Sequence, residues 1–355
     1  MGGLGLMFRR RAIQAHPTIS EGGYILSAEK GDAEVFRILM EKGVSSDGVG
    51  ITKEDAAKVT SISTWFQGNT DIVSFPELIY FTGISTIGKG AFNGCSALRT
   101  IDISNATTIG DNAFYNCTSL GGEYELLKLD SLGSGAFRNT QISSIIAPNV
   151  TTLYANTFNG CKSLINADFR NVVTIGSSAF NGCSALRTID ISNATTIGIS
   201  AFSGCVSLNG KLDLRYVTSL GDNAFYNSAL TGEISLMSLM GGIGSGTFRN
   251  TQIISIIAPF ATAIGSNAFS DSKSLTIIDI SNVTSINASA FSGCKAMIAF
   301  ICRSTNPPSL ANANAFSNTN NCPIYVPDSA VDAYMTAENW STYAARIKPL
   351  SEYQG

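Results

Sequence analysis

The chain has 355 residues, of which only 14% are charged, and its formal net charge is −3. This balance excludes both the basic surface of a nucleic-acid-binding protein and the strongly acidic composition of a disordered tail. No apolar run approaches the roughly 18 residues of a membrane-spanning helix, so no membrane insertion is expected.

The first 80 residues precede the regular part of the chain. Residues 1–23 show no periodicity and place the basic cluster Arg9–Arg11 after a short apolar stretch, the reverse of a secretory signal, so we interpret them as a flexible basic arm without a recognisable signal peptide. Residues 24–80 are predicted to form a helical N-terminal cap, with one helix within Glu29–Glu41 and a second that starts at a capping box of Thr52 and Asp55. The loop between them lacks the oxygen ligands of a calcium site.

From Gly83 onward the sequence repeats at a spacing of about 22 residues. Each unit carries a phenylalanine followed by an L-x-x-I-x-I segment. A fixed period of about 20 to 29 residues with this apolar core is typical of a leucine-rich-repeat solenoid. Residues 81–321 are therefore assigned to about 11 repeats. The repeated residues are Phe92, Phe114, Phe137, Phe158, Phe180, Phe202, Phe225, Phe248, Phe269, Phe291 and Phe316.

Within a unit, the L-x-x-I-x-I segment alternates with period two and predicts a short strand. Strands of successive units are expected to stack in parallel about 4.8 Å apart on a concave face, with the phenylalanine on the convex side and the following NATTIG-type segment turning the chain. Residues 322–355 are predicted to be a strand–helix C-terminal cap, with a helix from Asp328 through Trp340 and Tyr343. The predicted fold class is an α/β-type repeat solenoid, a horseshoe with a parallel concave sheet.

The eight cysteines follow the repeat. Six of them lie three residues after the repeated phenylalanine, where other units have serine or threonine, so we interpret them as reduced core residues. Cys302 and Cys322 fall outside this series, and a disulfide between them is possible but not favoured. No C-x-x-C motif occurs, and one histidine does not complete zinc sites, so no metal or other cofactor is expected.

The position between the two strand isoleucines is the candidate binding column. Side chains there are expected to point to the concave face, where Asp168, Asp190 and Asp213 would be neighbours on consecutive strands. Like charges across a ladder repel, so the column indicates either a cationic ligand or local compensation by arginines two residues further on. The candidate ligand-binding strip comprises Asp102, Glu125, Asp168, Arg170, Asp190, Asp213, Arg215 and Asp279.

Catalysis has little support in the sequence. The single histidine, His16, lies in the arm outside the repeats, and the carboxylates recur as a ladder rather than as one pair in different environments. The prediction is that the protein is not an enzyme.

Long stretches of the repeat region are near copies of one another. NGCSALRTIDISNATTIG occurs at 93–110 and at 181–198, and FRNTQISSIIAP at 137–148 returns as FRNTQIISIIAP at 248–259. Such recent duplication suits a variable recognition surface better than a fixed active site.

The motif I-G-x-x-A-F-x-x-C-x-x-L-x-x-I, which begins at Ile87 and includes Phe92 and Cys95, resembles the BspA-like leucine-rich repeats over about residues 72–316. The C-terminal segment IYVPDSAVDAYMTAENWSTYAARIKPL is also similar to the closing segment of many such bacterial proteins. The resemblance implies a role in cell-surface adhesion or protein binding, with no catalytic residues.

Three functions follow as hypotheses. The first is a non-enzymatic module that binds a protein or glycan on a cell surface. The second is a bacteriophage fibre or decoration protein, docked on virion proteins through residues 1–23. The third is an intracellular protein–protein scaffold. The localisation remains open between the cell surface, the secreted state and the virion, and no nucleic-acid partner is expected.

Overall fold

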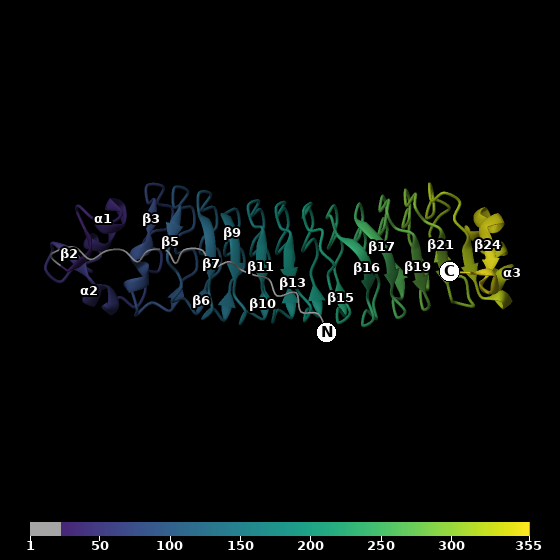
Figure 1. Cartoon of the computed structure of the whole chain (residues 1–355), viewed down its shortest axis with the longest axis horizontal. Coiled ribbons are helices and arrows are strands. Elements are labelled where there is room, and N and C mark those ends of the chain that lie inside the picture. Colours follow the sequence, from purple (N-terminus) through teal and green to yellow (C-terminus); the bar gives the residue numbers. More distant parts are fainter. Residues whose placement is uncertain (1–22, 355) are drawn as a thin grey trace.

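The computed structural model describes residues 23–354 and shows one elongated stack of turns (Figure 1). Residues 1–22 and residue 355 lie outside the described part of the chain. Nearly all of the predicted arm, and the docking on virion proteins assigned to it, therefore fall outside the described residues.

All but one of the turns add a strand to a first parallel array, formed mainly by the L-x-x-I-x-I segments. Leucine and isoleucine of this motif are buried, and in most turns the residues between them are half-buried or exposed, as period-two alternation requires; β21 near the C-terminal end is buried at every position. The array comprises β3 (Ser74–Phe75), β5 (Thr100–Ile101), β7 (Gly121–Glu125), β9 (Gln141–Ile146), β11 (Asn166–Asp168), β13 (Thr188–Asp190), β16 (Thr231–Ser235), β17 (Gln252–Ile257), β19 (Ile277–Ile280), β21 (Ala299–Cys302), β23 (Ile324–Val326) and β24 (Ile347–Pro349).

A second array is made by the T-T-I-G segments, which the sequence suggested would only turn the chain. In most turns a small residue, usually Thr or Ser, and the buried Ile or Leu after it form a two-residue strand, and these strands also pair in parallel. They are β4 (Thr86–Ile87), β6 (Thr108–Ile109), β8 (Ser131–Leu132), β10 (Thr152–Leu153), β12 (Thr174–Ile175), β14 (Thr196–Ile197), β15 (Ser219–Leu220), β18 (Ala263–Ile264), β20 (Ser285–Ile286) and β22 (Ser309–Leu310).

The first array is divided into three sheets. Their strand orders are β3-β5, β7-β9-β11-β13 and β16-β17-β19-β21-β23-β24. The break between β13 and β16 falls at residues 211–214, which form no strand.

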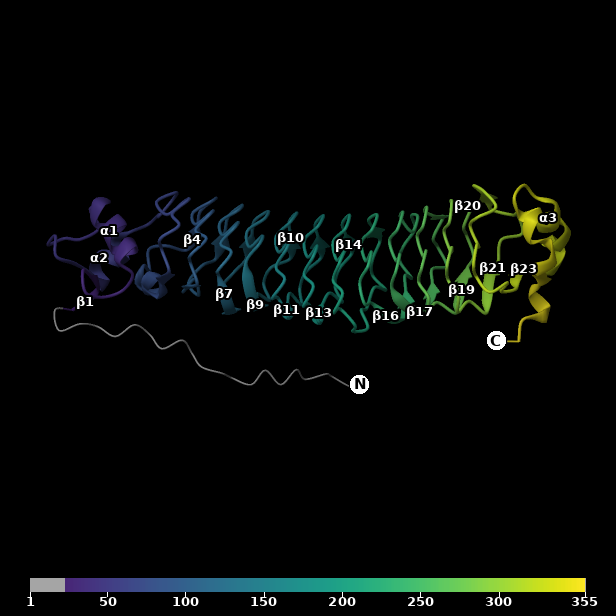
Figure 2. The same ribbon diagram turned by 90° about the horizontal axis from the view of Figure 1, so that it is seen from above.

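The predicted stack of parallel strands is present, and the solenoid bends only slightly in both views, so it is a shallow form of the expected horseshoe (Figure 2). Backbone hydrogen bonds link successive turns on more than one side. Besides the two strand arrays, the phenylalanine turns are linked, as in the 2.8 Å bond from Phe92 N–H to the Ala113 carbonyl. Because several sides share nearly the same spacing, no side forces strong curvature.

The core contains a continuous column of stacked phenylalanine rings. Neighbouring rings lie 5.0–5.8 Å apart between centroids with interplanar angles of 2–16°. The column begins one ring earlier than the sequence suggested, at Phe66, which stacks on Phe92. Phe66 and Gly68 have the same F-x-G spacing as Phe92 and Gly94, and this pattern could have identified Phe66 as a member of the column.

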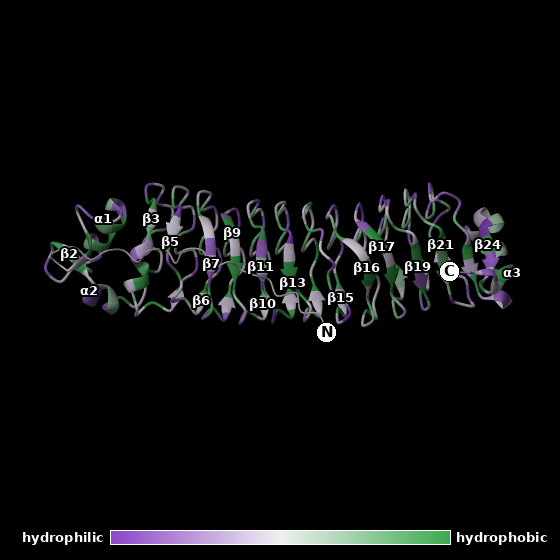
Figure 3. Cartoon of the chain, in the orientation of Figure 1, coloured by the Kyte–Doolittle hydropathy of each residue, from purple (hydrophilic) through white to green (hydrophobic). Residues whose placement is uncertain are grey.

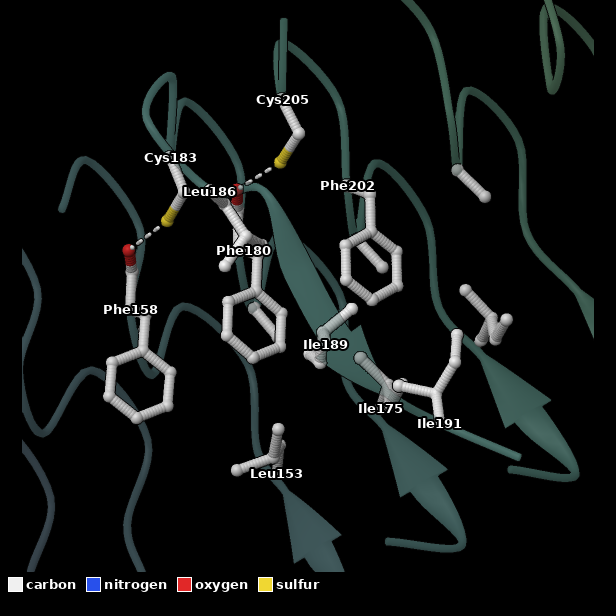
Figure 4. Packing of buried hydrophobic residues seen from close by; sticks show 14 of the residues in the cluster. Leu153, Phe158, Ile175, Phe180, Cys183, Leu186, Ile189, Ile191, Phe202 and Cys205 are labelled. Carbon is white, nitrogen blue, oxygen red and sulfur yellow. Dashed lines mark hydrogen bonds between the residues drawn. The ribbon is translucent and has the colours of Figure 1, made fainter. Parts of the chain in front are cut away.

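The cysteines form a second internal ladder, and all eight are buried free thiols, including Cys302 and Cys322. Each repeat thiol donates to the carbonyl of the phenylalanine one turn earlier, as Cys183 does to Phe158 at 3.0 Å and Cys205 to Phe180 at 3.2 Å (Figure 4). Ser272 makes the same bond to Phe248. Most turns therefore place at this position a small side chain that donates a hydrogen bond, whereas the buried Ser228 hydroxyl has no such partner.

Replacing Cys183 with alanine is expected to lower the free energy of unfolding by about 1–2 kcal/mol, because the Phe158 carbonyl then loses its buried donor. Cys183→Ser should cost less, since Ser272 already fills the equivalent position. Urea denaturation of both variants measures the difference, and equal losses would contradict the hydrogen-bonding role.

The N-terminal cap consists of short elements at the N-terminal end of the stack (Figure 1). It contains β1 (Tyr24–Ser27), α1 (Ala33–Glu41), β2 (Gly50–Thr52), α2 (Lys53–Lys58) and the 3-10 helix η1 (Pro76–Tyr80). The helix expected within Glu29–Glu41 starts at Ala33 because Asp32 caps it, and the predicted capping box of Thr52 and Asp55 is present.

The C-terminal cap differs from the single helix expected there. It contains η2 (Asp328–Ala330), α3 (Val331–Thr336), η3 (Trp340–Arg346) and η4 (Leu350–Glu352). The helix breaks at residues 337–339, where Ala337 is extended and Asn339 is left-handed, with φ 62°, and the side-chain amide of Asn339 donates to the Leu310 carbonyl at 2.7 Å. The cap is thus held by hydrogen bonds to the last turn of the solenoid instead of by one continuous helix. No helix in residues 23–354 has the length and apolarity needed to cross a membrane.

Candidate functional site

The candidate site is the outward surface of the first strand array, which we call the strand face. It consists of the outward-facing side chains of β5 through β21 together with residues 211–213. The pairing register holds the central column in line from turn to turn, with Asp168 beside both Ile146 and Asp190, and Asp279 beside both Ile257 and Ile301. The column is therefore a series of side chains on a support of hydrogen-bonded strands.

Asp168 and Asp190 are direct neighbours on β11 and β13. The guanidinium of Arg170 forms an ion pair with Asp168, and its Nε donates to Asp168 Oδ1 at 3.1 Å. These carboxylates, Asp168 first and Asp190 after it, raise the pKa of Arg170, so Arg170 compensates the repulsion between them. Asp190 is exposed and accepts hydrogen bonds from the Ser192 backbone and hydroxyl at 3.0 and 2.8 Å.

Asp213 follows in the turn that forms no strand. Its carboxylate accepts from Arg215 Nε at 2.9 Å, an exposed ion pair of the same i, i+2 type as Asp168 and Arg170. Asp213 is thus present on this surface, but no strand pairing aligns it with Asp190. The compensation by arginine that the sequence suggested is found at both positions.

Asp279 has a partner that the sequence analysis missed. Arg303, on the following turn, contacts both carboxylate oxygens, with Nε and Nη2 at 2.8 and 2.7 Å. Arg303 lies 24 residues later, directly after β21, so only the pairing of β19 with β21 brings the two together. The available signal was the position of Arg303, two residues after the column residue Ile301.

The remaining members of the predicted strip are less engaged. Asp102 is half-buried and accepts from the Ser104 backbone and hydroxyl at 3.0 and 2.7 Å. Glu125 is exposed at the end of β7. At the opposite end of β7, a shallow hollow is lined by Arg99, Thr100, Ser119, Gly121 and Gly122, where two glycines leave space next to an exposed guanidinium.

The arrangement offers binding chemistry. The strand face carries both carboxylates and, at three of them, guanidinium groups, which can accept from and donate to hydroxyl, ammonium or carboxylate groups of a ligand. Among residues 23–354, no group of three or more His, Cys, Asp or Glu side chains is placed to hold a metal ion.

The parallel strand arrays, the phenylalanine column and the side-chain ladders define a leucine-rich-repeat solenoid. The family model described as the BspA-type leucine-rich repeat region matches the chain at residues 60–122, 85–209, 123–231 and 218–334. Because these matches together span well over half of the sequence, the chain belongs to the BspA-type leucine-rich-repeat family.

Solved structures of other repeat proteins are similar to this one. A leucine-rich repeat protein from Bacteroides ovatus is 21% identical, with 81% of this chain and 86% of that chain covered and a TM-score of 0.49. A leucine-rich cell surface protein from Faecalibacterium prausnitzii is 20% identical, with 79% and 78% covered and a TM-score of 0.42. The pneumococcal vaccine antigen PcpA is 15% identical, with 76% of each chain covered and a TM-score of 0.44. None of the curated proteins compared with the chain matches it.

Proposed function

We propose that this protein is a non-enzymatic binding or adhesion module that recognises a protein or glycan on a cell surface through its strand face. Membership of the BspA-type family supports a binding role. The strand face is the surface on which the solenoid presents side chains from many turns in one line, and a contact surface that extends over successive repeats is how such solenoids bind partners.

The observation that carries the proposal is the aligned charged column with its built-in arginine partners. Asp168 and Asp279 are each held by a guanidinium, so their positions are fixed before any ligand arrives. A preordered polar surface loses less conformational entropy on binding than a flexible one. Asp190 is exposed between the fixed groups and is the carboxylate best placed to meet a cation or hydroxyl.

The test is a triple variant in which Asp168, Asp190 and Asp213 become asparagine. We expect binding to whole bacterial cells or to extracellular matrix proteins to weaken about tenfold or more, because charge-assisted hydrogen bonds of roughly 1.5–3 kcal/mol each would be replaced by weaker neutral ones. Binding is measured with purified protein by titration, and cooperative thermal unfolding verifies the fold.

A matched control changes three exposed carboxylates away from the column, Asp71, Asp130 and Asp332, to asparagine. This variant has the same net charge as the test variant and should bind like the unmodified protein. Equal loss in both variants would indicate a non-specific charge effect, and undiminished binding by the test variant would remove the strand-face column from the site.

A further inference from the structure

The strand face changes character near its middle, where an apolar patch replaces the charged column. The patch consists of Met237, Met240, Ile254, Ile257 and Phe260, which are 46, 74, 45, 47 and 46% exposed. They belong to β16, β17 and the segments that follow these two neighbouring strands. In Figure 3 the ribbon of β17 is largely green, whereas that of β7 is white to purple.

The internal duplication shows that two residues of the patch, Ile254 and Phe260, are not required by the fold. Residues 137–150 and 248–261 are near copies, and both form the same strand at the same place in a turn. Where the second copy has Ile254 and Phe260, the first has Ser143 and Asn149. Asn149 even donates to the Leu127 carbonyl at 3.0 Å, a bond that phenylalanine does not make. Apolar residues that replace functional polar ones on a surface indicate a contact partner.

We propose that this partner is the chain's own N-terminal segment, residues 1–22. Its sequence places the apolar run Leu4–Phe8 before the basic cluster Arg9–Arg11. If the segment runs from the cap along the strand face, its basic cluster comes first and its apolar run second. The strand face presents groups that suit them in the same order, first the carboxylates and then the apolar patch. The arginines would pass over the turns of Asp168 and Asp190, and the apolar run would reach the patch.

The spacing agrees with this order. Asp190 and Ile257 are three turns apart, which is about 14 Å at the usual strand separation. Arg10 and Leu6 are four residues apart, or about 13 Å in an extended chain. The eight turns from β3 to β17 measure about 38 Å, while residues 6–23 can span about 56–61 Å, so about 18–23 Å remains for the cap between β1 and β3. The segment joins the cap at β1, which lies on the same side of the molecule as β7, β9 and β17 in Figure 2.

The size of the patch favours an attached segment over a second copy of the chain. Five half-exposed side chains offer a few hundred Å², whereas a stable dimer buries about 800 Å² on each partner. An attached segment needs less contact, since its tether supplies an effective concentration in the millimolar range.

The test is disulfide trapping in the full-length chain. Gly5→Cys is combined with Ser238→Cys, a position within the patch, and the control combines Gly5→Cys with Lys128→Cys, the matching position of the first copy. All eight native cysteines are buried, so the introduced thiols react first under a mild oxidant. We expect the Ser238 pair to form an intramolecular disulfide about tenfold faster, although Lys128 lies nearer to the cap.

A second variant adds Ile254→Ser and Phe260→Asn to the Gly5/Ser238 pair, restoring the residues of the first copy. It should fold normally and lose the rate advantage. Equal rates for the Ser238 and Lys128 pairs, unchanged trapping after the patch is restored to polar residues, or disulfides formed only between separate chains would each overturn the proposal.

Discussion

Replacing Phe180 with alanine is expected to lower the free energy of unfolding by about 3–5 kcal/mol. The ring is fully buried and stacks between Phe158 and Phe202, with centroids 5.2 and 5.3 Å away. Its removal leaves a cavity in the middle of a column that the surrounding turns fill only partly. Equilibrium denaturation in urea, followed by circular dichroism, gives the loss.

The one-dimensional architecture makes a second effect visible in the same experiment. Each turn contacts mainly its neighbours, so weakening one interface in the centre reduces the coupling between the two halves. We expect a broader transition for Phe180→Ala. The control is Phe260→Ala, which removes a phenylalanine that is 46% exposed and should change stability by no more than about 0.5 kcal/mol. Similar losses in both variants would contradict the role assigned to the column.

Replacing Trp340 with alanine is expected to destabilise the C-terminal end by about 3–5 kcal/mol. Trp340 is fully buried, packs on Phe316 and Tyr334, and its indole N–H donates to the Pro308 carbonyl at 2.7 Å. Without it, the last phenylalanine of the column loses its cover. Hydrogen exchange measured by mass spectrometry should show faster exchange in residues 291–347 and little change near the N-terminal cap.

Trp340→Phe separates packing from hydrogen bonding at this position. It retains an aromatic ring but leaves the Pro308 carbonyl without its donor, so a smaller loss of about 1–3 kcal/mol is expected. Uniformly faster exchange along the whole chain would show instead that the cap and the distant turns unfold as one unit.

Much of the molecule follows from local sequence pattern. The period of about 22 residues, the inward leucine and isoleucine positions and the buried cysteines are each encoded within a single unit, and repetition makes the signal strong. The column residues Asp168 and Asp190 could be aligned because the unit between them has the standard length. Their arginine compensation was also readable, since Arg170 follows Asp168 by two residues.

Other features depend on contacts that no single unit contains. The second strand array arises because two-residue segments of a small residue and a buried Ile or Leu meet their counterparts in adjacent turns, and two residues are too few to indicate a strand by themselves. Arg303 reaches Asp279 only through the pairing of β19 with β21.

The sequence by itself determined the repeat class, the buried ladders and the identity of the charged column, because these depend on spacing along the chain. The tertiary structure decided the overall shape, the ion-pair partners across turns and the form of the C-terminal cap. Curvature is set by the relative spacing of all sides of the stack, and the break at Asn339 is set by its hydrogen bond to Leu310. The curvature and the helix break both depend on contacts between turns, and the residue pattern within a single unit does not specify those contacts.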